Sequence, residues 1–416
     1  MKILKGIKVI DVTAYAFVPA AGGVLAHWGA DVIKVESPKA PDPMRLIGGT
    51  LEPGRSSPTF KHYSRGKRSI AIDLATAEGQ DLLYRLAKDA DVFLTSYLAP
   101  TRRKLKIDVE DIRKINPDIV YARGSGYGPK GPDADRPGFD AIAWWYRSSL
   151  GETAMKAADA DWPVTMIGHG DGMSGLVLAG GIATALLHRE RTGEAVVVDG
   201  SLMGTALWFN GLEMIGAQGV PITGVIPGKV RSGPATRKQP GGGVATAMAG
   251  PATMQLYQTA DYRFINLLFL GDDDRDFIDL CHRIGRAELV TDSRYADRQK
   301  RMTNAADLRD LLDAEFASRT LAEWRDVLAT ARGAWAAVQS REEALVDPQT
   351  VANGYMRDVD YPDGGFKLPI PAILFDEDGG EPSPAPDFAE HTDAILSEIG
   401  LGPAEIAQMK AQGTIV

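Results

Sequence analysis

The chain of 416 residues contains a single cysteine, Cys281. One cysteine forms neither an intramolecular disulfide nor a cysteine-based zinc site, so both kinds of scaffold are excluded. The six histidines show no H-E-x-x-H motif and no paired spacing. The phosphate-binding motif G-x-x-x-x-G-K-[ST] and the nucleophile motif G-x-S-x-G are also missing. These absences argue against P-loop nucleotide binding, histidine-ligated metal sites and serine hydrolase chemistry.

The chain also lacks an excess of positive charge and long hydrophobic runs. Its net charge of -9 argues against a general nucleic-acid binder, which has a basic balance. The longest nearly apolar run, Leu176 to Leu187, is shorter than the ~20 residues that span a membrane. No apolar stretch of signal-peptide length precedes Asp11. We expect a soluble, cytoplasmic protein without a nucleic-acid or membrane partner.

Short apolar runs alternate with amphipathic segments in the first half of the chain. This alternation predicts βαβ units, a mostly parallel sheet and a doubly wound α/β fold. The run Gly124 to Gly128 (GSGYG) is not the G-x-G-x-x-G of nicotinamide-binding proteins. The expected strands are 8–12, 31–36, 69–74, 91–97 and 119–123, and the expected helices are 19–28, 77–88, 109–115 and 174–189.

A change of composition divides the chain into parts. Residues 1–210 are expected to form a large domain, and the glycine-rich residues 211–250 a linker. Residues 251–335 begin with strand-like patterns around 255–270 and continue with helical patterns at 274–285 and 305–330. We expect a smaller α/β domain there. Residues 336–416 follow it and end in a helical tail.

Asp171 lies in a glycine-rich run, Gly168 to Gly175 (GHGDGMSG), ahead of an apolar helix. A carboxylate beside a helix N-terminus is expected to stay ionised, because the free N–H groups favour the anion. Asp171 is either an ordinary helix-capping or turn residue or an accessible carboxylate nucleophile. The residue pattern alone does not choose between these interpretations.

Two further features also have two interpretations each. Gly241, Gly242 and Gly243 form either a plain linker or a mobile lid that excludes water from a reactive intermediate. The basic runs 67–68 and 102–106 are either solvated surfaces or sites for an anionic cofactor. The second interpretation is supported by their place beside predicted strand ends, where parallel sheets bind ligands.

Segments along nearly the whole chain together resemble the family III CoA-transferases, also called the carnitine and bile-acid CoA-transferase family. The order and spacing of these segments carry the resemblance, since no single motif decides it. They are GIKVIDV at 6–12, GADVIKVE at 29–36, RGKRS at 65–69, RPGFD at 136–140, the pair Gly170-Asp171, LHRERTG at 187–193 and EHT at 390–392.

The resemblance implies a CoA-transferase with Asp171 as the catalytic residue and Gly241 to Gly243 as the oxyanion and lid loop. It implies a Rossmann-like large domain that residues 336–416 return to complete, and an interlocked homodimer. The substrates are coenzyme A, as an acyl-CoA, and a small carboxylic acid, without a metal or redox cofactor. The implied CoA contacts are Tyr15, Ala16, Lys39, Ile72, Ser96, Tyr97, Lys104, Leu105, Ser125 and Tyr127. This chain has Pro38, Ser96 and Ser125 where some members have arginine, asparagine and lysine, and Lys39 takes over from the missing arginine.

Two alternatives from other classes remain. The family includes 2-methylacyl-CoA racemases, which need two opposed acid/base groups at the α-carbon. Phe139 stands where racemases have a histidine, and His169, two residues before Asp171, is the candidate substitute. A non-catalytic CoA-binding protein is the other alternative. The aromatic residues Phe139, Trp144, Trp145 and Tyr146 either line a pocket for a bulky apolar or aromatic acyl group or belong to a helix core, and we expect at least two of them to be core residues.

Overall fold

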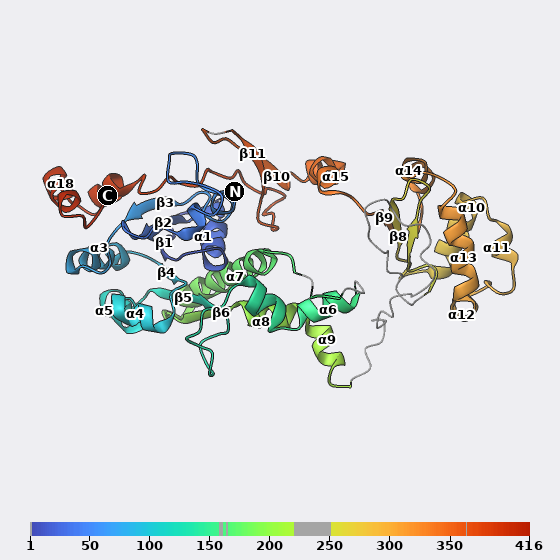
Figure 1. Cartoon of the computed structure of the whole chain (residues 1–416), viewed down its shortest axis with the longest axis horizontal. Helices are drawn as coiled ribbons and strands as arrows, with labels where there is room; N and C mark the ends of the chain where they lie inside the picture. The colour runs from blue at the N-terminus through green and yellow to red at the C-terminus, as the bar shows by residue number, and fades with distance from the viewer. Residues whose placement is uncertain (1, 158–160, 164, 220–250, 363) are drawn as a thin grey trace. The chain divides into compact units, whose positions relative to one another are not determined.

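The structure is a computed structural model, and it describes every residue except 1, 158–160, 164, 220–250 and 363. The predicted loop of Gly241 to Gly243 therefore lies outside the described residues. The chain divides into two compact units (Figure 1). The larger unit comprises Met1–Gly151, Thr165–Gly211 and Asp347–Val416, and the smaller comprises Glu152–Val164 and Leu212–Val346.

A six-stranded sheet with the strand order β3-β2-β1-β4-β5-β6 lies at the centre of the larger unit. Every neighbouring pair in it is parallel. The strands are β1 (Lys8–Val12), β2 (Asp31–Glu36), β3 (Arg68–Ala71), β4 (Val92–Thr95), β5 (Val120–Ser125) and β6 (Val197–Ser201). This mixed α/β fold with a central parallel sheet confirms the predicted fold class.

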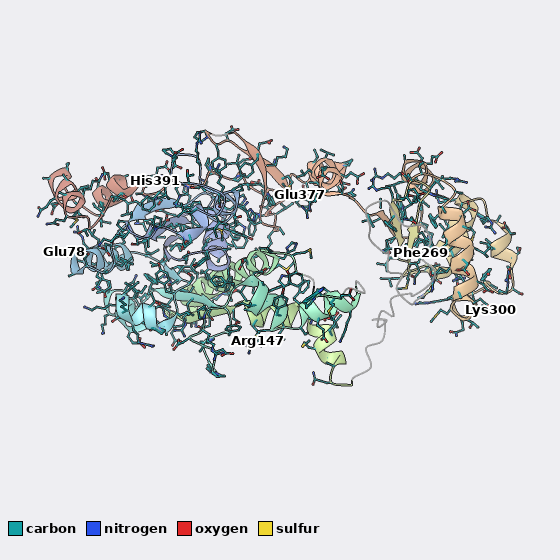
Figure 2. The ribbon with its side chains drawn as sticks, in the orientation of Figure 1. Glu78, Arg147, Phe269, Lys300, Glu377 and His391 are labelled. Carbon is teal, nitrogen blue, oxygen red and sulfur yellow. The ribbon has the colours of Figure 1, made fainter. Side chains whose placement is uncertain are left out.

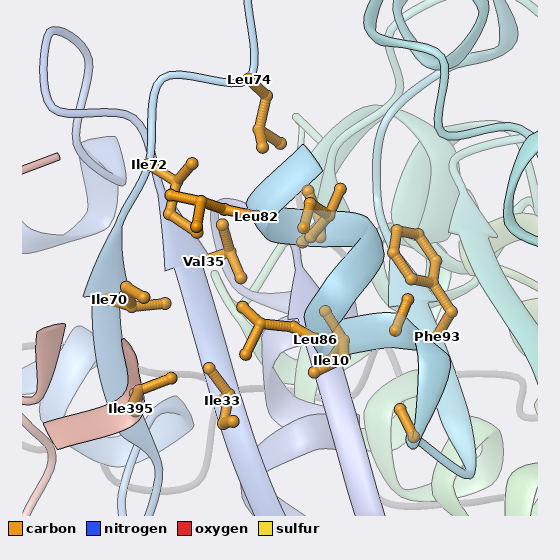
Figure 3. Close-up of a cluster of buried hydrophobic side chains, with 14 of the residues drawn as sticks. Ile10, Ile33, Val35, Ile70, Ile72, Leu74, Leu82, Leu86, Phe93 and Ile395 are labelled. Carbon is orange, nitrogen blue, oxygen red and sulfur yellow. The ribbon is translucent and has the colours of Figure 1, made fainter. Parts of the chain in front are cut away.

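One face of the sheet packs against helices through an apolar core. Ile10, Ile33 and Phe93 point from the strands towards Leu86 of α3 (Ala77–Lys88) and Ile395 of α17 (Thr392–Glu398), as Figure 3 shows. The sequence forms α3 because Thr76 caps its start and leucines recur along one face. The same core includes Ile112 of α5 (Val109–Ile115) and Ile406 of α18 (Pro403–Ala411), and Leu105 of α4 (Ala99–Leu105) packs against it.

The opposite face of the sheet is covered by α1 (Phe17–His27) and α7 (His169–Thr192). The two helices approach closely because glycine lies at their contact: a Cβ at Gly175 would stand 2.5 Å from that of Ala20. Helix α7 is long and apolar enough to cross a membrane, which its apolar run alone did not indicate. A buried core helix meets the same criterion, and α7 packs on α1, β5 and β6.

The C-terminal segment joins the larger unit beside β3. The backbone N–H of His391 donates to the carbonyl of Ser69 at 2.9 Å, and the N–H of Asp73 donates to that of Thr414 at 2.8 Å. Figure 2 labels His391 beside this sheet. The segment also contains a hairpin of β10 (Met356–Val359) and β11 (Phe366–Pro369), and the helices α15 (Arg341–Val346) and α16 (Pro348–Ala352) precede the hairpin.

The smaller unit has an antiparallel sheet of β7 (Leu256–Gln258), β8 (Phe264–Leu267) and β9 (Trp335–Ala337). Its core includes Cys281, Phe316 and Trp324. The helices are α10 (Asp273–Arg283), α11 (Glu288–Thr291), α12 (Arg298–Thr303), α13 (Ala305–Phe316) and α14 (Leu321–Leu328). The predicted single helical segment 305–330 is therefore two helices, because Thr320 and Glu323 form a capping box that begins α14.

Candidate active site

The strand order reverses between β1 and β4, and the loops that follow these two strands meet at the carboxyl edge of the sheet. The hydroxyl of Ser96, after β4, accepts a hydrogen bond of 2.9 Å from the backbone N–H of Ala14, after β1. Open parallel sheets bind ligands in the crevice outside the carboxyl ends of the strands at such a reversal. The geometry therefore points to this edge as the site.

A cavity of about 280 Å³ opens at this edge, within the larger unit. Asp171 forms part of its wall, together with five of the predicted CoA contacts: Tyr15, Ala16, Ser96, Tyr97 and Ser125. The wall is largely apolar elsewhere and includes Phe17, Met44, Phe139 and Leu202. The structure thus brings the predicted catalytic residue and half of the predicted cofactor contacts to one cavity.

The other predicted contacts do not line this cavity. Lys39 is on the surface and forms an ion pair of 2.6 Å with Asp73. The side chain of Ile72 is fully buried in the core, so only its backbone could meet a ligand. The ring of Tyr127 lies under the guanidinium of Arg147, at 5.1 Å. As contacts with CoA, these residues stay predictions, as do Lys104 and Leu105 of α4.

Glycines bring two parts of the cavity wall into close contact. A Cβ at Gly126 would lie 2.5 Å from the Cα of Gly138, and one at Gly138 would lie 2.7 Å from the Cα of Gly126. Neither position accepts a side chain without a backbone shift. The hydroxyl of Ser125 accepts from the N–H of Gly128 at 2.9 Å and fixes the turn that follows β5.

Asp171 lies in the first turn of α7, and a second carboxylate holds that turn. Asp140 accepts hydrogen bonds from the N–H groups of Gly168, at 3.0 Å, and Asp171, at 3.2 Å. Asp140 begins a π-helix, η2 (Asp140–Tyr146), and is almost fully buried. A Cβ at Gly170 would lie 2.5 Å from an oxygen of Asp140, so glycine is required there. Asp140 therefore caps α7 from a distant segment.

Burial raises the pKa of Asp171, and the negative charge of Asp140 raises it further, to about 7. The sequence-based expectation of a firmly ionised carboxylate is therefore wrong. The helix N-terminus favours the anion only locally, whereas burial in the larger unit opposes it more strongly. A carboxylate of this pKa is more basic, and hence more nucleophilic when ionised, than an exposed aspartate.

The family model of CoA-transferase family III matches residues 4–392. The chain belongs to this family. It is 29% identical over 413 residues to (R)-2-hydroxy-4-methylpentanoate CoA-transferase of Clostridioides difficile, covering 98% of both chains. It is 28% identical to cinnamoyl-CoA:phenyllactate CoA-transferase of Clostridium sporogenes, covering 100% of this chain and 97% of that one. The chain is therefore an enzyme of the family III CoA-transferase type.

Solved structures of family III resemble this chain over nearly its full length. The crystal structure of Rv3272 from Mycobacterium tuberculosis has a TM-score of 0.74 and 27% identity, with 94% of this chain and 98% of that chain covered. A CAIB/BAIF family protein from Brucella suis has a TM-score of 0.74 and 28% identity, covering 95% and 99%. The fold of the family III enzymes is thus the fold of this chain.

The racemase alternative within family III is not favoured by the cavity. Phe139 lines the wall and stacks edge-on against Tyr15, with 5.0 Å between ring centroids, but carries no titratable proton. A ring nitrogen of His169, Nδ1, lies 3.1 Å from the carbonyl of Met166, and His169 does not line the cavity. His169 is therefore not placed to act as the second base.

Trp144, Trp145 and Tyr146 do not line the cavity of this family III fold, whereas Phe139 does. Trp144 and Trp145 are buried, and the indole N–H of Trp145 donates to the carbonyl of Met166 at 3.1 Å. Tyr146 is exposed, and none of the three lines the cavity. The expectation that at least two of them are core residues is confirmed.

Sequence reasoning assigned no role to two residues at this site. Asp140 lies within the RPGFD segment that supported the resemblance. The residues whose N–H groups donate to it, Gly168 and Asp171, are 28 and 31 positions away in the sequence. The hydroxyl of Tyr63 donates to the carbonyl of Gly168 at 3.1 Å, across 105 positions. No local pattern reveals such contacts, and only the fold of the family III enzyme brings them together.

Proposed function

We propose that this family III enzyme transfers CoA from an acyl-CoA donor to a free carboxylic acid through an aspartyl-CoA thioester on Asp171. The single observation that carries the proposal is the position of the Asp171 carboxylate, on the wall of the cavity at the strand-order reversal. The relatives named for CoA transfer between organic acids support the same chemistry. A non-catalytic CoA-binding role does not account for a carboxylate of raised pKa on this wall.

In the proposed mechanism, an Asp171 oxygen attacks the thioester carbonyl of the donor. The carbon–sulfur bond breaks, CoA thiolate leaves, and a mixed anhydride remains on Asp171. The thiolate then attacks the aspartyl carbonyl, and the donor's acid departs as a carboxylate. The acceptor carboxylate then attacks the carbonyl of the aspartyl-CoA thioester, expels CoA thiolate and leaves a new mixed anhydride on Asp171. The thiolate attacks the acceptor's carbonyl in this anhydride, which gives the new acyl-CoA and releases the Asp171 carboxylate. The thioester energy is kept in covalent bonds throughout.

Each attack places negative charge on a carbonyl oxygen, and backbone N–H groups are the proposed donors to that charge. One such donor contributes typically ~3 kcal/mol to a transition state. The N–H of Asp171 itself is bonded to Asp140, so the proposed donors are other groups at the start of α7 and the loop of Gly241 to Gly243. The mechanism itself requires no metal ion or redox cofactor.

Binding of CoA is assigned to the residues of the cavity wall that follow β1, β4 and β5. Tyr15, Ala16, Ser96, Tyr97 and Ser125 are proposed to contact the cofactor there. The outer parts of CoA extend beyond a cavity of about 280 Å³. Lys39, Ile72, Lys104, Leu105 and Tyr127 are therefore proposed as contacts outside it.

The proposed function is tested by incubating the protein with a panel of acyl-CoAs and free acids and following the acyl-CoA products by mass spectrometry. Aryl 2-hydroxy acids, bile-acid-like acids and carnitine-like acids belong in the panel. We expect at least one new acyl-CoA to form as its donor disappears, without accumulation of free CoA. Hydrolysis alone, or no reaction across a broad panel, would contradict the transferase assignment.

Racemisation is separated from transfer by isotope exchange. Because Phe139 carries no exchangeable proton, incubation with a 2-methylacyl-CoA in deuterated water should give negligible deuterium at the α-carbon. Mass spectrometry of the recovered acyl-CoA measures this directly. Rapid exchange together with racemisation would contradict the assignment as a transferase and would indicate that His169 acts as the second acid/base group.

We propose that the enzyme is an interlocked homodimer, as the resemblance to its family implies. Large apolar side chains on α8 (Leu202–Phe209), Trp208 and Phe209, are 86% and 59% exposed in the single chain, which is typical of a surface that a partner covers. Interlocked subunits separate only with extensive unfolding. Sedimentation at low micromolar concentration should therefore show a dimer, and a folded monomer there would contradict the proposal.

A further inference from the structure

A buried ion pair lies directly behind the wall of the candidate active site. The Nζ of Lys34, on β2, stands 2.8 Å from Oδ2 of Asp42, and both side chains are fully inaccessible to solvent. Neighbouring side chains extend the same cluster, since Lys67 pairs with Asp11 at 2.8 Å and is equally buried. Charges in such a place carry a desolvation cost, and well-packed apolar residues often replace a buried pair without loss of stability. Stability alone therefore does not explain this pair.

Asp42 and Lys34 form hydrogen bonds with backbone groups at the cavity wall and in the loop after β1. Oδ1 of Asp42 accepts from the backbone N–H groups of Tyr15 and Met44, each at 3.0 Å, and both residues line the cavity. The ammonium of Lys34 donates to the carbonyl of Thr13 at 2.9 Å. The two charged groups thus hold the loop after β1 at Thr13 and at Tyr15.

The backbone conformation of Tyr15 is intrinsically unfavourable and requires stabilising contacts. Its φ of 71° lies in the left-handed region, which is unfavourable for a residue with a Cβ. Without a fixed acceptor for its N–H, the residue is expected to relax towards negative φ. Such a change would rotate both the peptide and the ring of Tyr15, which contacts Phe139 across the wall.

Both members of the pair are charged. Burial acts to raise the pKa of Asp42, but the charge of Lys34 and the hydrogen bonds from Lys34, Met44 and Tyr15 outweigh it and lower this pKa. Burial acts to lower the pKa of Lys34, and the carboxylates of Asp42, Asp11 and Glu36 outweigh it and raise it. The carboxylate of Asp42 is therefore a strong, fixed acceptor at neutral pH.

We infer that Asp42, held by Lys34, is a positioning residue of the active site: it fixes Tyr15 and Met44 in the conformation that binds an acyl-CoA. This inference rests on the proposed function of the cavity. Asp42 touches no substrate in this account and acts only through the backbone of the wall.

The test compares two neutral replacements of the pair, so that neither leaves an unpaired buried charge. In Lys34→Gln/Asp42→Asn, the new amide at 42 keeps an acceptor oxygen for Tyr15 and Met44. Its NH₂ group donates to the new amide at 34, which can still donate to Thr13. In Lys34→Met/Asp42→Leu, shape is approximately kept, but the acceptor is lost. The apolar variant is expected to fold with a lower melting temperature than the wild type, because the N–H groups of Tyr15 and Met44 and the carbonyl of Thr13 lose their partners.

The dissociation constant of CoA, measured by calorimetry, and the KM and kcat of transfer are the readouts. The amide pair should bind CoA within about threefold of the wild type, and the apolar pair at least roughly tenfold more weakly. The apolar pair should raise KM by a similar factor with kcat within about threefold, because Asp171 is untouched. Hydrogen exchange at the Tyr15 amide should be faster in the apolar pair only.

A matched control replaces another buried ion pair, in the smaller unit. Arg301 lies 2.6 Å from Asp273, and Arg301→Met/Asp273→Leu should leave CoA affinity unchanged. Equal affinity of the wild type and the Lys34→Met/Asp42→Leu variant would overturn the inference, and so would equal weakness of both Lys34/Asp42 variants. A wild type that binds no CoA would refute the proposed function itself, whereas either of the other results refutes only the positioning role.

Discussion

Replacing Asp171 with asparagine should abolish CoA exchange while leaving CoA bound. The amide keeps the shape of the side chain but cannot form the anhydride or the aspartyl thioester. Loss of a covalent nucleophile costs at least roughly a thousandfold in turnover. The dissociation constant of CoA should stay within about tenfold of the wild type, or about 1.4 kcal/mol, because the cavity wall is otherwise intact. Steady-state transfer and calorimetry measure the two quantities on the same preparation.

The control for this variant is Asp81→Asn, which makes the same chemical change at an exposed position on α3 and should leave transfer unchanged. Fresh preparation of Asp171→Asn matters, because deamidation restores the aspartate. Near-normal turnover by a variant that mass spectrometry shows to be free of deamidation would mean that Asp171 is not the nucleophile.

The pH dependence of kcat/KM should fall steeply on the acid side. Asp171 attacks as a carboxylate, and its pKa is about 7, because burial and the charge of Asp140 both raise it. Activity should therefore be level above this pH and fall about tenfold for each unit below it, reaching roughly a hundredfold loss near pH 5. Profiles measured between pH 5 and 8.5, within the stable range of the protein, test this expectation.

The raised pKa of Asp171 makes the stability of the folded protein fall as pH rises, whereas it makes the activity rise. The folded-state pKa of Asp171 is raised above its ordinary value of 3.8, so between about pH 4 and 7 the folded protein binds more protons than the unfolded chain. The contribution of this group to stability therefore falls as pH rises through that window. Asp171→Asn should be more stable than the wild type at pH 8, by roughly 2 to 4 kcal/mol, with little difference at pH 4.

Asp140→Asn identifies the part of the shift that comes from charge. Without the second carboxylate, the acid side of the kcat/KM profile should move to lower pH, although one of the two hydrogen bonds to the start of α7 is lost. Asp81→Asn again serves as the matched control and should leave the profile in place. A flat wild-type profile from pH 5 to 8 would contradict the raised pKa of Asp171.

The central strands of the larger unit could be predicted from the sequence, because strands buried on both faces are short continuous apolar runs. The expected ranges for β1 and β2 coincide with the structure. Strand β6 was missed, since its sequence VVDGS contains aspartate and glycine and is mostly half-buried. The two-helix division at Thr320 was readable in principle, because a threonine followed three residues later by glutamate marks a helix start.

The candidate site could be predicted only in part. The glycine run and the family resemblance pointed to Asp171, and the cavity contains it. The sign of its pKa shift could not be predicted, because a helix N-terminus is visible in sequence whereas burial and the approach of Asp140 arise from tertiary packing. Asp42 lies 27 positions from Tyr15, from whose N–H it accepts, and Lys34 lies 21 positions from Thr13, to whose carbonyl it donates. Ordinary charged residues at that spacing carry no local signal.

Trapping the covalent intermediate shows whether Asp171 is the nucleophile of the transfer reaction. Hydroxylamine attacks acyl anhydrides and thioesters, so treatment of the enzyme with acyl-CoA and then hydroxylamine should convert Asp171 to a hydroxamate. Mass spectrometry of the digested protein should show the modification on the peptide that contains Asp171, only when acyl-CoA was present, and never in Asp171→Asn. An unmodified Asp171 in enzyme that is turning over acyl-CoA, or a hydroxamate on a different carboxylate, would contradict the account.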